Sequence, residues 1–219
     1  RIKEKIKKVQ DYPKTLEQQT SLQTKLTLQL QKKKISIAQF NQQYPTPPPN
    51  FEKFNSITIQ YLDNHYFIPI IYGDGNNQTI IKPIIDVESE TKLIGVLLTT
   101  IADENSKLHE FDWWMFSRIE AKKDDVLIPY YDGESVKIRK FYPDFIFWLK
   151  KGKKYFMMFI DPKGTQNTSY KFKVDGFKKI FSKNQKHGGL DVKVMLFLYT
   201  DDQNQLPLTL QPDWRDSIE

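Results

Sequence analysis

The first 50 residues carry apolar side chains at helical spacing and then a proline-rich stretch. Pro13 separates two apolar stripes, and a short third helix is predicted over residues 37–43 with Ser36 as its N-cap. Residues 44–50 contain four prolines, which is typical of an extended linker. We therefore predict a helical arm and linker over residues 1–50. The two stripes consist of Ile2, Ile6 and Val9, and of Leu22, Leu26 and Leu30.

The pattern changes to β-structure over residues 51–85. Residues 56–61 alternate between apolar and polar side chains, and residues 66–72 and 79–85 are rich in apolar and β-branched side chains, so three strands are predicted. A glycine-rich turn at 73–77 lies between the last two of them. The turn lacks the GK[ST] sequence of a phosphate-binding loop, as does the rest of the chain, so no nucleotide motor of that class is present. This β-rich lead-in either extends a later sheet or forms a small unit of its own.

A helix is predicted over residues 86–102, where the apolar period returns to that of a helix. Ser89 is the expected N-cap, and the acidic side chains that follow it suit the positive end of the helix dipole. The apolar stripe of this helix consists of Leu93, Ile94, Leu97, Leu98 and Ile101.

Three further strands are predicted over residues 111–120, 126–131 and 136–141. The Trp113–Trp114 pair is expected to be buried against the core, and Asp132-Gly133 is a hairpin turn signal. The third strand is expected to run on as far as Asp144. Because Pro143 lacks an N–H group, it would mark a bulge or an edge there.

Two apolar segments, residues 144–149 and 154–161, are joined by a basic turn that contains Gly152. Neither segment alternates cleanly, which predicts strands covered on both faces in the middle of an α/β sheet. Folding the chain about the turn pairs residues whose numbers sum to roughly 303, which brings Asp144 opposite residues 159–161. Side-chain alternation then places Asp161 and Lys163 on the same face.

An amphipathic helix is predicted to follow, from a cap at Ser169 to an end at residues 187–189, and then a buried strand over 191–199. A strand, a helix and a strand in this order form a parallel crossover. The predicted fold is therefore α/β, with an αβββαβ core and a mixed central sheet over residues 86–219. The apolar side of the helix carries Tyr170, Val174, Phe177 and Phe181, and its other positions are rich in lysine.

Composition excludes several classes of site. The chain has no cysteine, so disulfides, cysteine-based zinc sites and thiol catalysis are excluded, and its three histidines are far apart. No apolar run reaches membrane-spanning length and no signal peptide is evident, from which we expect a cytoplasmic protein. The sequence begins with arginine rather than methionine, so we expect a fragment of a longer protein.

Positive charge is concentrated in two parts of the chain. Residues 1–40 hold ten Lys/Arg against three Asp/Glu, and residues 136–187 hold fourteen against three. Such regions suit a polyanionic partner. A solvated basic surface is the alternative for both, and for the arm a structural role is preferred to DNA binding.

Two carboxylates and one ammonium group are predicted to meet at one end of an apolar hairpin. Burying bare carboxylates is costly, and two adjacent carboxylates repel each other. A hard divalent cation removes both costs, and a nearby lysine can stabilise charge that develops on a phosphate. Asp144, Asp161 and Lys163 therefore predict metal-assisted chemistry at a phosphate.

Pro143-Asp144 and, 17 residues later, Asp161-Pro162-Lys163 resemble the motif of the PD-(D/E)xK nuclease superfamily. The run resembles more closely the C-terminal endonuclease domain of type III restriction subunits and related helicase-linked nucleases. The resemblance implies a restriction-endonuclease-like fold, Mg²⁺-dependent cleavage of DNA (Mn²⁺ being a possible substitute), and a helicase or translocase region in the same polypeptide or complex. The second acid is aspartate here, where glutamate is commoner in the superfamily.

The resemblance also implies roles for individual residues. Asp144, Asp161 and the carbonyl of Pro162 would bind the metal, and Lys163 would orient the attacking water. Ser89-Glu90 resembles the start of the first helix in helicase-linked relatives, which makes Glu90 a candidate accessory acid that helps to bind the metal or the water. Glu120 is a second candidate, and Glu90 could equally be an acid that only favours a helix N-terminus. The lysines expected to hold the DNA backbone are Lys150, Lys151, Lys153, Lys171, Lys178 and Lys179.

Two alternatives to an active nuclease remain at this point. One is a nuclease fold that has lost its chemistry and only holds DNA. The other is a partner-docking domain in which the N-terminal helices do the work. No base-reading element is evident from the sequence, and the choice between DNA and RNA stays open, as does the oligomeric state.

Overall fold

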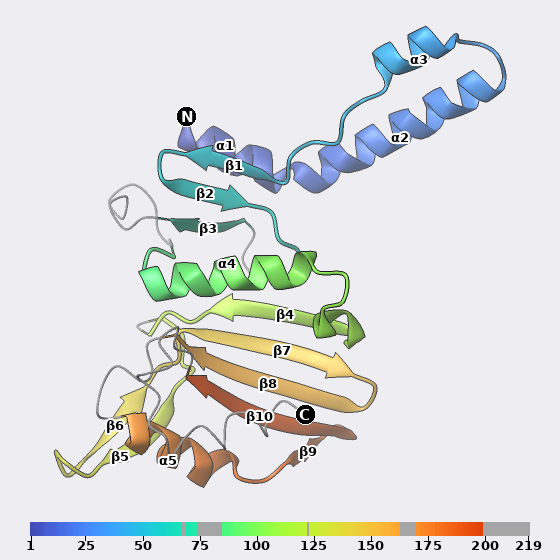
Figure 1. The fold of residues 1–219 in the computed structure, drawn as a ribbon. Coiled ribbons are helices and arrows are strands. Elements are labelled where there is room, and N and C mark those ends of the chain that lie inside the picture. The colour runs from blue at the N-terminus through green and yellow to red at the C-terminus, as the bar shows by residue number, and fades with distance from the viewer. Residues whose placement is uncertain (67–68, 74–84, 122, 163–169, 199–219) are drawn as a thin grey trace. The chain divides into compact units, whose positions relative to one another are not determined.

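The structure is a computed structural model that describes residues 1–66, 69–73, 85–121, 123–162 and 170–198 (Figure 1). The chain divides into two compact units, Arg1–Asp86 and Val87–Glu219. Among the described residues, no helix combines the length and the apolar character needed to cross a membrane. The two units are described in turn.

The first unit combines three helices with a small antiparallel sheet. Val9 of the first helix packs on Ile57, Ile59 and Ile71 of the sheet, and Glu52 binds two lysines of the same helix. The first helix and the sheet are therefore packed together. The elements are α1 (Ile2–Gln10), α2 (Tyr12–Gln31), α3 (Ile37–Gln43), β1 (Phe51–Phe54), β2 (Ile57–Gln60) and β3 (Ile70–Gly73), with strand order β1-β2-β3.

Helix boundaries in the first unit follow local signals closely. Ser36 caps α3 as expected: its hydroxyl accepts the N–H of Gln39 at 3.2 Å, and the Gln39 side chain accepts the N–H of Ser36 at 2.9 Å. The expected break at Pro13 is wrong by two residues, because α1 gives way to α2 at Asp11 and Pro13 lies in the first turn of α2. Proline is tolerated there since its missing N–H would have no partner in the helix. The strand predicted over 79–85 lies outside the described residues except for Ile85, which forms a parallel bridge with Tyr72.

The second unit is built on a mixed five-stranded sheet of order β4-β7-β8-β10-β9. β8 and β10 run parallel, and the other neighbours are antiparallel. The prediction of an α/β unit with a mixed sheet is confirmed, and β7, β8 and β10 are its interior strands. The elements are α4 (Glu88–Ala102), η2 (Lys107–Glu110), β4 (Trp113–Arg118), β5 (Ile128–Asp132), β6 (Lys137–Phe141), β7 (Phe145–Lys151), β8 (Lys154–Asp161), α5 (Tyr170–Phe181), β9 (Gln185–His187) and β10 (Leu190–Leu198).

The β7–β8 hairpin turns on two residues. Lys151 pairs with Lys154 and Phe145 with Ile160, so each partner lies two positions later than the sequence suggested. The turn begins at Gly152, whose φ of 58° lies in the left-handed region that glycine adopts without steric cost. The register is therefore fixed by the one glycine in the basic turn.

The two faces of the sheet are covered by different elements. On one face Ile146, Phe159 and Leu198 belong to a buried cluster that α5 and the β5–β6 hairpin complete. On the other face the rings of Trp114, Phe116 and Phe147 are stacked, and Arg118, in phase with Phe116 along β4, binds Glu90 of α4. Thus α5 and α4 cover opposite faces.

The β5–β6 hairpin forms a separate two-stranded sheet packed on α5. A Cβ atom on Gly176 of α5 would lie 2.5 Å from Cβ of Tyr130 and 2.8 Å from the carbonyl oxygen of Pro129. Glycine, which is unfavourable in a helix, is required here because the helix axis passes close to β5.

Two strand predictions need correction. The strand expected to run from residue 136 to Asp144 is two strands in different sheets, because β6 ends at Phe141 and β7 begins at Phe145. Pro143, fully buried between them, cannot donate to a ladder. The tryptophan pair is also not buried as a pair: Trp114 is buried and Trp113 is exposed, since successive side chains of a strand point to opposite faces.

Helix ends in the second unit differ from expectation as well. Val87, not Ser89, is the N-cap of α4, and the Ser89 hydroxyl lies within the first turn. The expected helix end at residues 187–189 is instead a hairpin turn between β9 and β10, with both Gly188 and Gly189 at positive φ. The predicted cap Ser169 and the tail after residue 198 lie outside the described residues.

Candidate functional site

Carboxylates gather at the end of the sheet where β8 ends and β7 begins. Asp144 is the residue directly before β7, and continuing the β7–β8 register pairs it with Asp161, the last residue of β8. The N–H of Ile119 donates to the carbonyl oxygen of Asp144 at 2.8 Å, which fixes Asp144 between β4 and β8. Adjacent positions of this kind lie about 5 Å apart at Cα. The structure therefore brings these two predicted site residues together.

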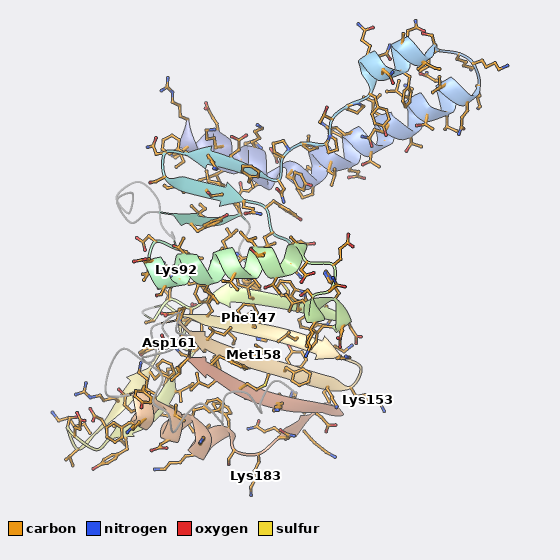
Figure 2. The ribbon with its side chains drawn as sticks, viewed as in Figure 1. Lys92, Phe147, Lys153, Met158, Asp161 and Lys183 are labelled. Atoms are coloured by element: carbon orange, nitrogen blue, oxygen red, sulfur yellow. The ribbon has the colours of Figure 1, made fainter. Side chains whose placement is uncertain are left out.

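Both carboxylates point to the face covered by α5. Asp144 is in phase with Ile146, and Asp161 is in phase with Phe159, and both of these apolar side chains belong to the cluster under α5. Asp161 is only 6% exposed, and Asp144 is half-buried. Figure 2 shows Asp161 at the end of β8 opposite to the β7–β8 turn. Two carboxylates at this spacing repel each other and need a positive charge.

Lys173 of α5 provides a positive charge on that face. Its Nζ atom lies 3.5 Å from Oδ2 of Asp161 and 4.5 Å from the centre of the Phe141 ring. The sequence placed this lysine only among the basic residues of the helix that would hold the phosphate backbone, and did not pair it with Asp161. The signal that could have singled it out is its spacing of three from Tyr170, because residues three apart share a helix face and Tyr170 is buried.

Glu90 approaches the same end of the sheet from the opposite face. Its carboxylate is 2% exposed, and Oε2 accepts from Nε of Arg118 at 3.0 Å. Burying the Glu90 carboxylate is costly, and Arg118 offsets part of that cost. The contact with Arg118 also holds the Glu90 side chain in place. Sequence reasoning missed Arg118, a single cation at the end of an apolar strand.

Glu120, the other candidate for the accessory acid, lies in a more open setting. Its carboxylate pairs with Lys123 at 2.6 Å, and its N–H donates to the carboxylate of Asp124 at 2.8 Å. Glu120 is half-exposed, whereas Glu90 is buried. Glu90 is thus the more enclosed of the two candidates, but it lies on the opposite face of the sheet from Asp144 and Asp161, and the described residues do not bring the three carboxylates into one metal-binding group.

Asp144 and Asp161 supply oxygen ligands of the kind that Mg²⁺ prefers. Mg²⁺ is commonly held by one or two carboxylates, with water and substrate phosphate completing its shell. Within the described residues, no group of three or more His, Asp or Glu side chains is arranged to hold a metal ion. The two carboxylates and the carbonyl of the buried Pro162 therefore fit a metal that shares its shell with a substrate. Lys163 lies outside the described residues.

The lysines of the β7–β8 turn lie at the far end of the hairpin. β8 spans residues Lys154–Asp161, so the turn is about 23 Å from the carboxylates at the usual rise per residue. Figure 2 shows Lys153 at that end. Lys151 pairs with Glu110 at 2.7 Å, and Lys150 lies 3.8 Å from Asp112. The predicted DNA-contacting lysines of α5, which are exposed, are Lys171, Lys178 and Lys179.

Comparison with known proteins gives one assignment. No curated protein and no solved structure matches the chain. A family model described as the YagJ family matches residues 84–219, which is more than half of the chain and includes the whole second unit. The chain therefore belongs to the YagJ family.

Proposed function

We propose that the second unit is a metal-dependent endonuclease domain that hydrolyses phosphodiester bonds of DNA. The observation that carries this proposal is the side-by-side placement of Asp144 and Asp161 on one face of the sheet, at the end of an apolar hairpin. Paired carboxylates in such a place are suited to a divalent cation and a phosphate.

The order of elements supports the same proposal. Without β5–β6 and β9, the second unit runs α4, β4, β7, β8, α5, β10, which is the αβββαβ order of a restriction-endonuclease-like core. The β5–β6 hairpin is then an insertion between the first two strands of that core. Element order alone does not define a function, so the site residues have to carry the proposal.

Each site residue has a distinct task in the proposed mechanism. Asp144, Asp161 and the Pro162 carbonyl would hold Mg²⁺ or Mn²⁺, which would lower the pKa of a bound water and polarise the phosphate. Before substrate arrives, Lys173 offsets the negative charge of Asp161 and keeps the two carboxylates together. Lys163 orients the attacking water and stabilises charge on the phosphate. Glu90, fixed by Arg118, is the accessory acid.

DNA contacts and partners follow from the charge. Lys171, Lys178 and Lys179 are exposed on the helix that covers the carboxylate face, so they are placed to hold the phosphate backbone. Lys150, Lys151 and Lys153 could reach only phosphates several base pairs away from the scissile one, because a duplex rises about 3.4 Å per base pair. A helicase or translocase region of the same polypeptide or complex would bring the domain to its substrate.

The test is cleavage by the wild-type chain and by Asp161→Asn. Supercoiled plasmid, a linear duplex, single-stranded DNA and RNA are incubated with each protein in Mg²⁺ and in Mn²⁺. We expect the wild type to cut DNA. In Asp161→Asn we expect the cleavage rate to fall by about a thousand-fold or more, because the metal ion would lose a carboxylate ligand. Asp191→Asn, an exposed aspartate on β10 near the turn end of the hairpin, is the matched control and keeps its rate. A wild type that binds DNA but cuts no substrate with either metal contradicts the proposal.

A further inference from the structure

The β5–β6 hairpin presents an outward face that none of the described elements of the second unit covers. Ile128, Tyr130 and Phe141 point inward and belong to the buried cluster under α5. Because side chains alternate, Tyr131 and its cross-strand partner Ile138 point outward. Ile138 is 79% exposed, and Tyr131 is also exposed. Tyr131 and Ile138 thus form an exposed cross-strand apolar pair on the outward face of the ribbon.

The tip of the hairpin is held in one conformation by Asp132. Its carboxylate accepts from the N–H of Glu134 at 3.1 Å and from the hydroxyl of Ser135 at 2.7 Å, and it pairs with Arg139 at 2.7 Å. The bond from Ser135 is the main reason that the pKa of Asp132 lies below its usual value. The tip is therefore preorganised, and Arg139 is engaged in holding it.

Val136 at the tip has a conformation that is unfavourable for its type. Its φ is 54°, in the left-handed region that β-branched residues rarely adopt, and its side chain is 70% exposed. Glycine or asparagine would be tolerated there at lower cost. Val136 is therefore an exposed apolar residue whose backbone conformation is held at some cost by the turn around it.

The hairpin is attached directly to the candidate active site. β6 ends at Phe141, whose ring lies under Lys173, and three residues later the chain reaches Asp144. Figure 1 shows the hairpin beside α5, projecting from the end of the sheet where β8 finishes. A partner bound at the carboxylates would therefore meet the hairpin.

Charge and shape identify the partner as a duplex nucleic acid. Lys140 is exposed on the same face of β6 as Ile138, and Lys137 is exposed on the other face. Lys171, Lys178 and Lys179 of the adjoining α5 are exposed as well, so this part of the molecule is suited to a polyanion. The major groove of B-DNA is about 12 Å wide and admits a two-stranded β-ribbon. Strands of five residues extend about 17 Å, enough to span the depth of the groove.

We propose that the β5–β6 hairpin enters the major groove of the DNA next to the bond that is cut. Ile138 and Tyr131 contact base edges, where apolar side chains meet thymine methyl groups, and Lys137 and Lys140 contact the flanking phosphates. This inference rests on the proposed nuclease function and adds to it a base-contacting element. The preference for particular bases would thus come from this domain itself.

The test is duplex binding by the 219-residue chain in the Asp161→Asn background, which prevents cutting. Fluorescence anisotropy of a short labelled duplex is measured over a range of salt concentrations for the parent and three variants. In K137Q/K140Q we expect the slope of log affinity against log salt to fall in magnitude by about 1.8, since each lost phosphate contact removes about 0.9. In Y131A/I138A we expect about a five-fold or greater loss of affinity with the slope unchanged. The control K107Q/K186Q, two exposed lysines near the turn end of the sheet, should bind like the parent.

The outcomes separate this inference from the proposed function. Hairpin variants with the parent's affinity and slope overturn the inference even if the wild type cuts DNA. A parent that binds no duplex overturns it as well. Binding that depends on the hairpin, with no cutting by the wild type, supports the inference and overturns only the nuclease function. A further outcome is that Y131A/I138A keeps the parent's DNA affinity, while K137Q/K140Q has a smaller slope of log affinity against log salt. This outcome would overturn the base contacts and assign the apolar face to a protein partner. The substituted side chains are exposed, so thermal unfolding should match the parent.

Discussion

The two ends of the β7–β8 hairpin carry similar charges in different surroundings. At the turn end, Lys151 pairs with Glu110 and both side chains are more than half exposed. At the other end, Asp161 pairs with Lys173 and Glu90 pairs with Arg118, and both carboxylates are buried. The β7–β8 hairpin thus has solvent-exposed ion pairs at its turn end and buried ion pairs at its other end.

The difference indicates which end is built for function. An exposed ion pair contributes at most about 1 kcal/mol, whereas taking a charge out of water costs several kcal/mol before its partner offsets it. Stability alone would be served better by apolar residues at the carboxylate end. Charges that are enclosed in spite of this cost mark a candidate site, and the lysines of the turn do not.

The largest effect is expected from breaking the pair between Glu90 and Arg118. Arg118→Met leaves the Glu90 carboxylate buried without its cation, and we expect the free energy of unfolding of the second unit to fall by about 3 kcal/mol. E90L/R118M, which removes both charges, should recover most of the loss. Urea unfolding followed by tryptophan fluorescence measures this unit alone, because all four tryptophans lie beyond residue 87.

Lys123→Met is the matched control for Arg118→Met. It breaks the more open pair between Lys123 and Glu120, and it should change the free energy of unfolding by less than about 1 kcal/mol. If Arg118→Met has the urea midpoint of the wild type, the buried pair contributes no more to the free energy of unfolding than an exposed pair. Burial would then not distinguish the two ends of the hairpin.

A smaller effect is expected when Lys173 is replaced. Its ammonium group lies 3.5 Å from Oδ2 of Asp161, so it competes with a metal ion for that carboxylate. In Lys173→Met we expect Mn²⁺ to bind about tenfold more tightly than in the wild type, measured by calorimetry on the protein alone. Lys171→Met, an exposed position on the same helix, should leave the affinity unchanged. Weaker binding in Lys173→Met would show that this lysine supports the metal site instead of competing with it.

The same contrast explains what could be read from the sequence. The apolar runs of β7 and β8 and the stripes of α4 and α5 identify these elements because each pattern lies within a few consecutive residues. Asp144 and Asp161 could be paired because the hairpin between them is local. By contrast, β9 has three exposed polar residues and no pattern, so it was missed.

The contacts of the two cations, Lys173 and Arg118, could not be predicted from patterns within consecutive residues. Lys173 reaches Asp161 only because α5 lies on the face of β8 that carries this aspartate, and Arg118 reaches Glu90 only because β4 lies beside β7 with α4 on its other face. Helical spacing could place Lys173 on the buried face of α5, but both contacts depend on how distant elements pack, which local spacing does not reveal. The separation of β6 from β7 at Pro143 has the same origin, since the choice of sheet is a tertiary one.

The smallest effect is expected at the turn end, where Lys151→Gln removes an exposed partner. The hydrogen bond and the charge of Lys151 hold the pKa of Glu110 below its usual value. Because that pKa is depressed in the folded protein, the pair stabilises the fold above the usual pKa of glutamate, and this contribution is lost as the pH falls through the folded-state pKa. In Lys151→Gln the pKa of Glu110 should rise towards its usual value, as followed by NMR titration of its carboxyl carbon. The urea midpoint at neutral pH should stay at that of the wild type, because solvent and salt screen a pair this exposed. A loss of stability comparable to that of Arg118→Met would show that exposure does not distinguish the two ends of the hairpin.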